Sequence, residues 1–256
     1  MIVDYAGFPA LSMAKPDRVC LRTANGADLV QYIENKKSDT QATIWKRDST
    51  KEIILGIPGT HSLQDWATDI SAVPVAYFDP DIECRGECRV HYGFLKAWNS
   101  IKSDVKKGLG SALKKHPGYG VTITGHSLGG ALATLAFVSL ARSQFGVRHA
   151  FTYGQPRVGN KDFAYFVDRL AKASEKSPGN FFRVTHANGR SHETGYTRKA
   201  ITDFGIASML QMAFRGCPRY SSTTCTVVLS TGSRLKFPPR KQRSAVLSMN
   251  LSAVIF

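Results

Sequence analysis

The residues best placed to do chemistry are a serine and the glycines around it. Ser127 is the centre of a G-x-S-x-G pattern that it forms with Gly125 and Gly129. A β-branched run precedes the pattern and a stretch of small apolar residues follows it, which predicts a strand, a sharp turn and a helix over residues 130–142. A serine on such a turn projects its Oγ clear of the backbone at the top of a sheet. We therefore interpret Ser127 as a nucleophile.

The glycines of this pattern have a structural reason to be there. We expect a Cβ at Gly125 or Gly129 to collide with the neighbouring strand or helix, and we expect the turn to need backbone angles that only glycine adopts cheaply. The helix that follows would aim its N-terminal N–H groups at a developing oxyanion. Because G-x-S-x-G also arises by chance, the prediction depends on the flanking strand and helix.

The order of the remaining elements predicts an α/β fold with a largely parallel sheet, because strands alternate with helices. In such sheets reactive groups gather beyond the carboxyl ends of the strands, which is where Ser127 is expected. The expected strands cover residues 40–45, 52–57, 121–124, 149–153 and 181–185. The expected helices cover residues 62–70, where Leu63, Trp66 and Ile70 have helical spacing, and part of 90–107, with Phe94, Leu95, Trp98, Ile101 and Val105 on one side.

The bulk composition is that of an ordinary globular chain. Its 256 residues are 43% hydrophobic and 21% charged, and no apolar run is long enough to span a bilayer. Residues 1–10 have no basic segment, and Asp4 interrupts their apolar stretch, so we do not predict a signal peptide there. Of the five cysteines, Cys84 and Cys88 are close enough to close a small loop.

The net charge of +15 is concentrated near the C-terminal end of the sequence. Residues 189–256 hold ten Lys and Arg but only two Asp and Glu, so a quarter of the chain carries half of the excess. There is no helical basic stripe, RNA-binding aromatic motif or zinc-finger spacing. We interpret this segment as a solvated basic tail, with only residues 200–214 suggesting a helix, rather than as a nucleic-acid site. A basic membrane-surface or nucleic-acid binder is the alternative.

Five segments together resemble the fungal-type class 3 lipases, which include triacylglycerol lipases and feruloyl esterases. They are residues 59–66, 84–94, 125–130, 152–160 and 182–188, in the order and spacing of the family. The resemblance covers about residues 20–188. It implies an α/β-hydrolase fold with a nucleophile elbow, hydrolysis of carboxylic esters such as acylglycerols in lipid catabolism, no metal or organic cofactor, and an extracellular monomer.

The resemblance also assigns roles to individual positions. Ser127 matches the nucleophile, and the backbone N–H of Leu128 matches one donor of the oxyanion hole. Thr60 matches the other donor, through its N–H and hydroxyl. The segment from Ser62 to Ile70 matches the lid, an amphipathic helix that turns toward a lipid surface; plain core packing is the alternative for its apolar residues. Pro58 departs from the family, which usually has a basic residue there, and a proline lacks an N–H and fixes φ.

The acid and base of a catalytic triad do not follow where the resemblance implies. A serine hydroxyl needs a neighbouring base, and the base needs an orienting carboxylate. The family has an Asp-x-x-Pro segment directly after Asn188, and a histidine far downstream. Here Asn188 is followed by Gly-Arg-Ser-His, and no histidine comes after His192. His192 is the candidate base, because His186 is expected to be structural on its strand and the side chain of His126 to diverge from Ser127.

Residues 1–188 are therefore interpreted as an α/β-hydrolase domain and residues 189–256 as an anomalous basic segment. A shifted reading frame or a mispredicted intron would explain both the basic tail and the missing motifs. A genuine homologue without catalytic activity, which binds lipid or acyl groups, is the other explanation.

Overall fold

The computed structural model describes Tyr5, Phe8, Pro9, residues 26–59, 73–84, 86–174, 177 and 179–184, and the backbone of residues 209–210, 225–228 and 234–237. In chain order the strands are β1 (Asp28–Asn35), β2 (Thr40–Arg47), β3 (Glu52–Ile57), β4 (Pro74–Ala76), β5 (Arg89–His91), β6 (Gly120–His126), β7 (Val147–Tyr153), β8 (Phe181–Val184), β9 (Met209–Leu210), β10 (Cys225–Val228) and β11 (Arg234–Phe237). The helices are α3 (Tyr92–Lys115), α4 (Leu128–Leu140) and α5 (Lys161–Ala171), and a 3-10 turn covers Asp48–Thr50.

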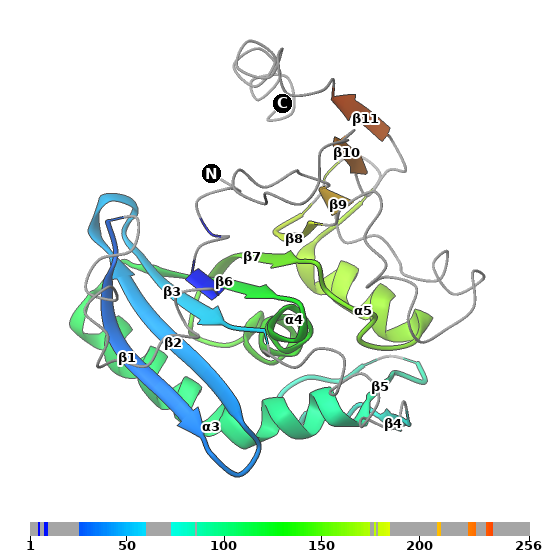
Figure 1. The fold of residues 1–256 in the computed structure, drawn as a ribbon, viewed down its shortest axis with the longest axis horizontal. Coiled ribbons are helices and arrows are strands. Elements are labelled where there is room, and N and C mark those ends of the chain that lie inside the picture. The colour runs from blue at the N-terminus through cyan, green and yellow to red at the C-terminus, as the bar shows by residue number, and fades with distance from the viewer. Residues whose placement is uncertain are drawn as a thin grey trace, which may run out of the picture.

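A nine-stranded sheet runs through the described part of the chain (Figure 1), in the order β1-β2-β3-β6-β7-β8-β9-β10-β11. The central strands from β3 to β9 are parallel, whereas β1–β2–β3 and β9–β10–β11 are antiparallel. The predicted α/β fold with a largely parallel centre is confirmed. The parallel strands end together at one edge, and the turn at Ser127 lies on that edge.

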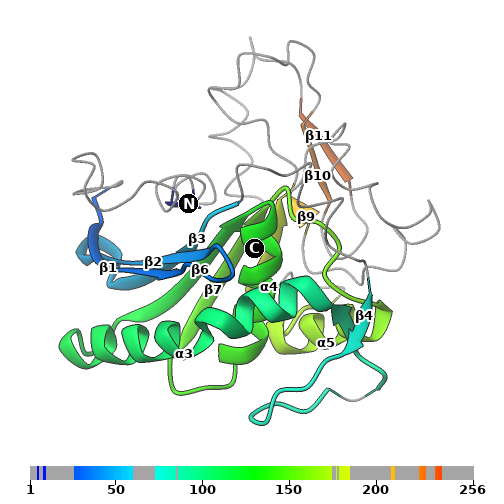
Figure 2. The ribbon, with the colours of Figure 1, turned by 60° about the horizontal axis from the view of Figure 1, so that its bottom comes forward.

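The three helices α3, α4 and α5 lie on one face of this sheet (Figure 2). All residues of α4 are buried, because it packs between the sheet and α3. On α3 the predicted apolar face is confirmed, since Phe94, Trp98, Ile101 and Val105 are buried. Among the helices that the structure describes, none has both the length and the apolar character needed to cross a membrane.

Tyr5, in the N-terminal segment, lies on the other face of the sheet, where its hydroxyl is bound to a buried carboxylate. Its hydroxyl is 2.8 and 2.9 Å from the two oxygens of Glu52, which also accept hydrogen bonds from Arg47, Thr50 and Thr122. Burial alone would raise the pKa of Glu52, but the bonds from these donors outweigh it and lower the pKa. Burial, with the adjacent carboxylate, raises the pKa of Tyr5 to about 12.

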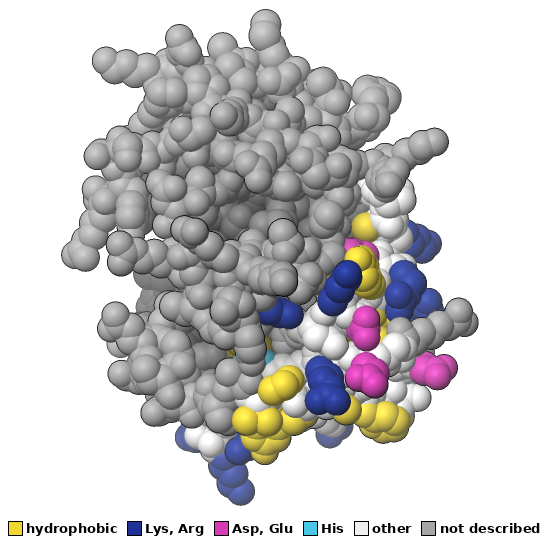
Figure 3. Space-filling model, turned by 90° about the vertical axis from the view of Figure 1, so that its right-hand side faces the viewer, with side chains coloured by type: hydrophobic (Ala, Val, Ile, Leu, Met, Phe, Trp, Pro, Cys, Tyr) yellow, Lys and Arg dark blue, Asp and Glu magenta, His cyan; other side chains and the backbone are white. Residues whose placement is uncertain are grey.

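A second buried carboxylate ties the loop after β4 to the helices. Asp79 accepts hydrogen bonds from Lys102 on α3, at 2.7 Å, and from Ser139 on α4, at 3.0 Å. The same loop contains a disulfide between Cys84 and Cys88, so the small loop expected from their spacing is formed. Hydrophobic side chains lie beside Lys and Arg on the side of the molecule where β4, β5 and α5 are found (Figure 3).

The structure differs from the sequence prediction at several elements. Residues 209–210 form the strand β9 beside β8, where the pattern of residues 200–214 suggests a helix, so that helix prediction is wrong at these positions. The strands β1, β4, β5, β10 and β11 and the helix α5 are not among the predicted elements. The strands β9–β11 belong to the central sheet although they come from residues 189–256, and the division of the chain at residue 188 stays a prediction.

Candidate active site

The predicted strand–turn–helix is present, with Ser127 between the last residue of β6 and the first residue of α4. Ser127 has φ 54° and ψ −120°, in the region of positive φ that non-glycine residues adopt at a cost of about 1–3 kcal/mol. Hydrogen bonds on both sides hold this conformation. The Ser127 N–H donates to the Tyr153 carbonyl at 2.8 Å, and its own carbonyl accepts from the Gly130 N–H at 2.9 Å.

The glycines of the pattern are required by space rather than by backbone angle. A Cβ on Gly125 would lie 2.8 Å from the backbone nitrogen of Gly130, and a Cβ on Gly129 would meet the carbonyl groups of Ile57 and Pro58. The predicted collision is therefore confirmed. The other half of the expectation is wrong, because neither Gly125 nor Gly129 has a positive φ. The turn puts that conformation on the serine instead.

The N-terminus of α4 points into the site. Leu128 begins the helix, and its backbone N–H belongs to the first turn, where N–H groups have no partner within the helix. This turn carries the positive end of the helix dipole, which favours negative charge next to Ser127. The donor role that the resemblance gives to Leu128 stays a prediction.

The chain that leaves β3 passes directly beside the nucleophile. A Cβ built on Gly59 would lie 3.2 Å from the His126 carbonyl oxygen and 3.4 Å from the Cβ of Ser127. Thr60 follows Gly59 in the sequence. Thr60 itself, the lid segment from Ser62 to Ile70, and the candidate base His192 lie outside the described residues.

A buried arginine supports the site from the next strands, and the sequence analysis missed it. Arg183 on β8 donates to the carbonyl of Gln155 at 2.7 Å, in the loop after β7. Burial lowers the pKa of Arg183 to about 10, so the guanidinium keeps its charge at neutral pH. Gln155 packs in turn on Gly130 in the first turn of α4, where a Cβ would lie 3.0 Å from that of Gln155. Arg183 thus fixes the loop that borders the elbow.

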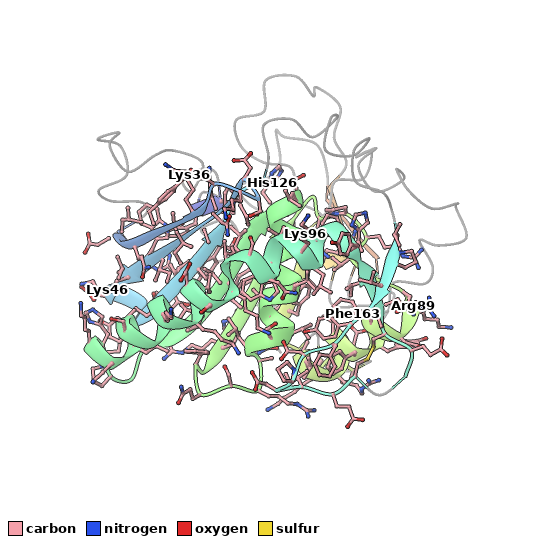
Figure 4. The ribbon with its side chains drawn as sticks, turned by 90° about the horizontal axis from the view of Figure 1, so that it is seen from below. Lys36, Lys46, Arg89, Lys96, His126 and Phe163 are labelled. Carbon is pink, nitrogen blue, oxygen red and sulfur yellow. A yellow bond between two sulfur atoms is a disulfide. The ribbon has the colours of Figure 1, made fainter. Side chains whose placement is uncertain are left out.

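The described histidines have other contacts. His91 accepts from the Gly93 N–H and caps α3, and His149 stacks on Phe151 in the middle of β7. His126 is exposed at the edge of the sheet where β6 ends (Figure 4), and desolvation lowers its pKa. No described histidine makes a hydrogen bond with the Ser127 side chain.

Among the described residues no group of three or more His, Cys, Asp and Glu could hold a metal ion. Separately, the described geometry places the hydroxyl-bearing Ser127 at the N-terminus of α4.

Comparisons with known proteins agree with this arrangement. A family model described as Lipase (class 3) matches residues 54–188. The secreted mono- and diacylglycerol lipase 1 of Fusarium solani is 31% identical over 164 residues, which cover 64% of this chain and 45% of that protein. A lipase of Rhizomucor miehei is 35% identical over 133 residues, covering 50% of this chain and 35% of that protein. The chain thus spans less than half the length of these two curated relatives.

A solved structure shows a similar fold. It is a triacylglycerol lipase described as having a serine protease triad for its catalytic centre, with a TM-score of 0.67 and 26% identity. The similarity covers 83% of this chain and 79% of that one. The described architecture is that of an α/β-hydrolase.

Proposed function

This chain belongs to the class 3 lipase family, and we propose that it is a serine hydrolase that cleaves the carboxylic esters of acylglycerols in lipid catabolism. The observation that carries the proposal is the backbone of Ser127, held at φ 54° at the head of a buried helix. A side chain in this position stands clear of the strand and faces the helix N-terminus. This placement serves nucleophilic attack, and the fold alone does not need it.

In the proposed reaction Ser127 Oγ attacks the acyl carbonyl carbon. The N–H groups of Leu128 and Thr60, with the Thr60 hydroxyl, hold the tetrahedral oxyanion. The intermediate collapses with loss of the alcohol, which leaves with a proton, and an acyl–serine ester remains. Water then attacks this ester and releases the carboxylic acid and the free serine. No metal or organic cofactor takes part.

The proton transfers in this sequence need a base, and the base is the open part of the proposal. His192 is the candidate that the sequence offers, and Asn188 is not followed by the Asp that the resemblance implies. We propose that turnover by the chain as written is impaired for this reason. Removal of triad members leaves only a residual rate over the uncatalysed reaction.

The second candidate function is a homologue that binds lipid or acyl groups without hydrolysing them. The same missing Asp favours it. Such a protein would keep the acyl pocket, but its Ser127 would have no base and would not react faster than a free serine hydroxyl.

We also propose that the protein is an extracellular monomer that contacts a lipid surface through the lid from Ser62 to Ile70. The described chain resumes after this segment with an exposed apolar pair, Val73 and Tyr92, 51% and 47% exposed. The Tyr92 N–H donates to the Val73 carbonyl at 3.1 Å, so the two lie side by side. The Fusarium solani relative is named as secreted, which supports the extracellular part of the proposal.

Covalent labelling separates the two functions. The purified chain is treated with a fluorophosphonate, which reacts with activated serines, beside its Ser127→Ala variant. We expect labelling of the wild type that is lost in Ser127→Ala, and labelling slowed by a factor of about 10²–10³ in Thr60→Ala. Labelling that survives in Ser127→Ala would refute Ser127 as the nucleophile. A wild-type chain that binds a fluorescent fatty acyl ester but never labels would be the binding homologue.

A further inference from the structure

The hydrogen bonds that hold the turn at Ser127 continue across the sheet to β8. The Ser127 N–H donates to the carbonyl of Tyr153 at 2.8 Å, and the N–H of the next residue, Gly154, donates to the carbonyl of Val184 at 2.9 Å. Tyr153 and Val184 are the last residues of β7 and β8. Because β6, β7 and β8 lie side by side in this order (Figure 1), the two bonds connect Ser127 to β8 through consecutive residues.

A charged side chain makes the next connection along the same loop. Arg183, the third residue of β8, donates from its guanidinium to the carbonyl of Gln155 at 2.7 Å. The two residues are 8% and 1% exposed, so little water competes for this bond. Burial lowers the pKa of Arg183 to about 10, and the guanidinium is therefore charged at neutral pH. A hydrogen bond from a charged donor is about twice as strong as one between neutral groups.

One planar peptide group carries both backbone bonds, since it contains the Tyr153 carbonyl and the Gly154 N–H. Its orientation therefore decides whether the Ser127 N–H keeps its acceptor. Gly154 follows this group at φ 58°, and a glycine leaves the chain free to rotate. The bond from Arg183 removes this freedom, because it fixes the carbonyl of Gln155 on the far side of the glycine.

We propose that Arg183 is a positioning residue for Ser127, which acts by holding the loop after β7 and thereby the peptide group that accepts from the Ser127 N–H. Ser127 has φ 54°, a conformation that persists only where its surroundings hold it. Without the bond from Arg183, Ser127 would spend less time in the conformation that presents its Oγ. The inference rests on the proposed function, because it assigns Arg183 an effect on nucleophilic attack by Ser127.

A second buried arginine provides the matched control. Arg47 is 7% exposed and bonds to the carboxylate of Glu52 at 2.7 Å. Glu52 is the first residue of β3 and pairs with Gly120 at the beginning of β6, whereas Ser127 follows the last residue of β6. Loss of the Arg47 ion pair should therefore destabilise the fold at the opposite end of the sheet without reaching the turn at Ser127.

The test compares Arg183→Met with Arg47→Met in the whole chain by hydrogen exchange. Methionine keeps the apolar part of the arginine side chain but has no donor. We expect the amides of Ser127 and Gly154 to exchange about tenfold faster in Arg183→Met, measured relative to the amides in the middle of α4. In Arg47→Met this ratio should stay at its wild-type value even if the whole chain is less stable.

The rate of fluorophosphonate labelling, measured on folded protein, is the second readout. Labelling of Ser127 should be about tenfold slower in Arg183→Met and unchanged in Arg47→Met. Arg183→Lys keeps the charge and a donor, so it covers the case in which Arg183→Met does not fold. Its labelling should be about threefold slower than that of the wild type.

Both readouts can contradict the proposal. Wild-type exchange at Ser127 and Gly154 in a folded Arg183 variant would overturn the positioning role, and so would an equal slowing of labelling in Arg47→Met. If the wild-type chain never labels while exchange responds as expected, the positioning role stands and the proposed hydrolase function fails.

Discussion

Replacement of Glu52 by glutamine tests how much the hydrogen bonds of this buried carboxylate contribute to the free energy of unfolding. Both carboxylate oxygens accept from Tyr5, one accepts also from Thr122, and the other from Arg47 and Thr50. In Glu52→Gln one oxygen becomes an NH₂ group, which at one position could donate to the hydroxyls of Tyr5 and Thr122 but at the other faces the Arg47 guanidinium, which cannot accept. The guanidinium of Arg47, whose side chain is 8% exposed, also loses the carboxylate 2.7 Å away.

The loss of one partner from a buried ion pair costs about 3–5 kcal/mol. For a chain of this size that corresponds to a fall in Tm of roughly 6–20 °C. The assay is urea unfolding of the intact, oxidised chain, followed by circular dichroism. The matched control is Glu34→Gln on the exposed side of β1, which should change the free energy of unfolding by less than about 0.5 kcal/mol. A loss below about 1 kcal/mol in Glu52→Gln would show that the network contributes little and would refute this reasoning.

The other predictions concern the effect of low pH on stability and substitutions in the turn around Ser127. The pKa values of Glu52 and Asp79 are lowered in the folded chain, so the stability they contribute is present above their unfolded values of about 4 and is lost as pH falls below them. The urea concentration at the midpoint of unfolding should therefore fall when the pH is lowered below about 4. This fall should be smaller in Glu52→Gln. Gly129→Ala should lose about 3 kcal/mol or more, visible as a lower Tm, because its Cβ meets two backbone carbonyls. Ser127→Gly should raise stability by up to about 2 kcal/mol, because relief of positive φ outweighs the added chain entropy, while fluorophosphonate labelling is lost; a lower Tm would contradict this.

The sequence predicts well those elements whose local pattern of apolar residues matches their burial in the fold. The strand β3 is buried along its whole length, so its apolar run and its structure coincide. The strand β1 was missed because it lies at the edge of the sheet with Ile33 as its one buried residue, which leaves no alternation to read. The helix α5 was missed although the sequence contains a helix-start signal, Asn160. The side chain of Asn160 accepts from the Phe163 N–H as the N-cap of α5.

The candidate site also has features that the local sequence predicts and features that depend on the tertiary structure. Ser127 is found from sequence because the strand, the turn and the helix that place it are contiguous. The close approach of the Ile57 and Pro58 carbonyl groups to Gly129 depends on β3 lying beside β6, which is a property of the sheet order. The bond from Arg183 to Gln155 likewise joins residues 28 positions apart. Local patterns carry no information on these pairs.

The strain at Ser127 bears on which of the two proposed functions is correct. A glycine would adopt φ 54° without penalty, and a pocket that only binds acyl chains needs no hydroxyl in that conformation. Yet the chain keeps a serine there, supported by the Tyr153 carbonyl and by the tight contacts of Gly129. Strain held in place by its surroundings is a mark of functional positions. The elbow therefore favours the hydrolase over the binding protein, and the difference between them reduces to whether a base reaches Ser127.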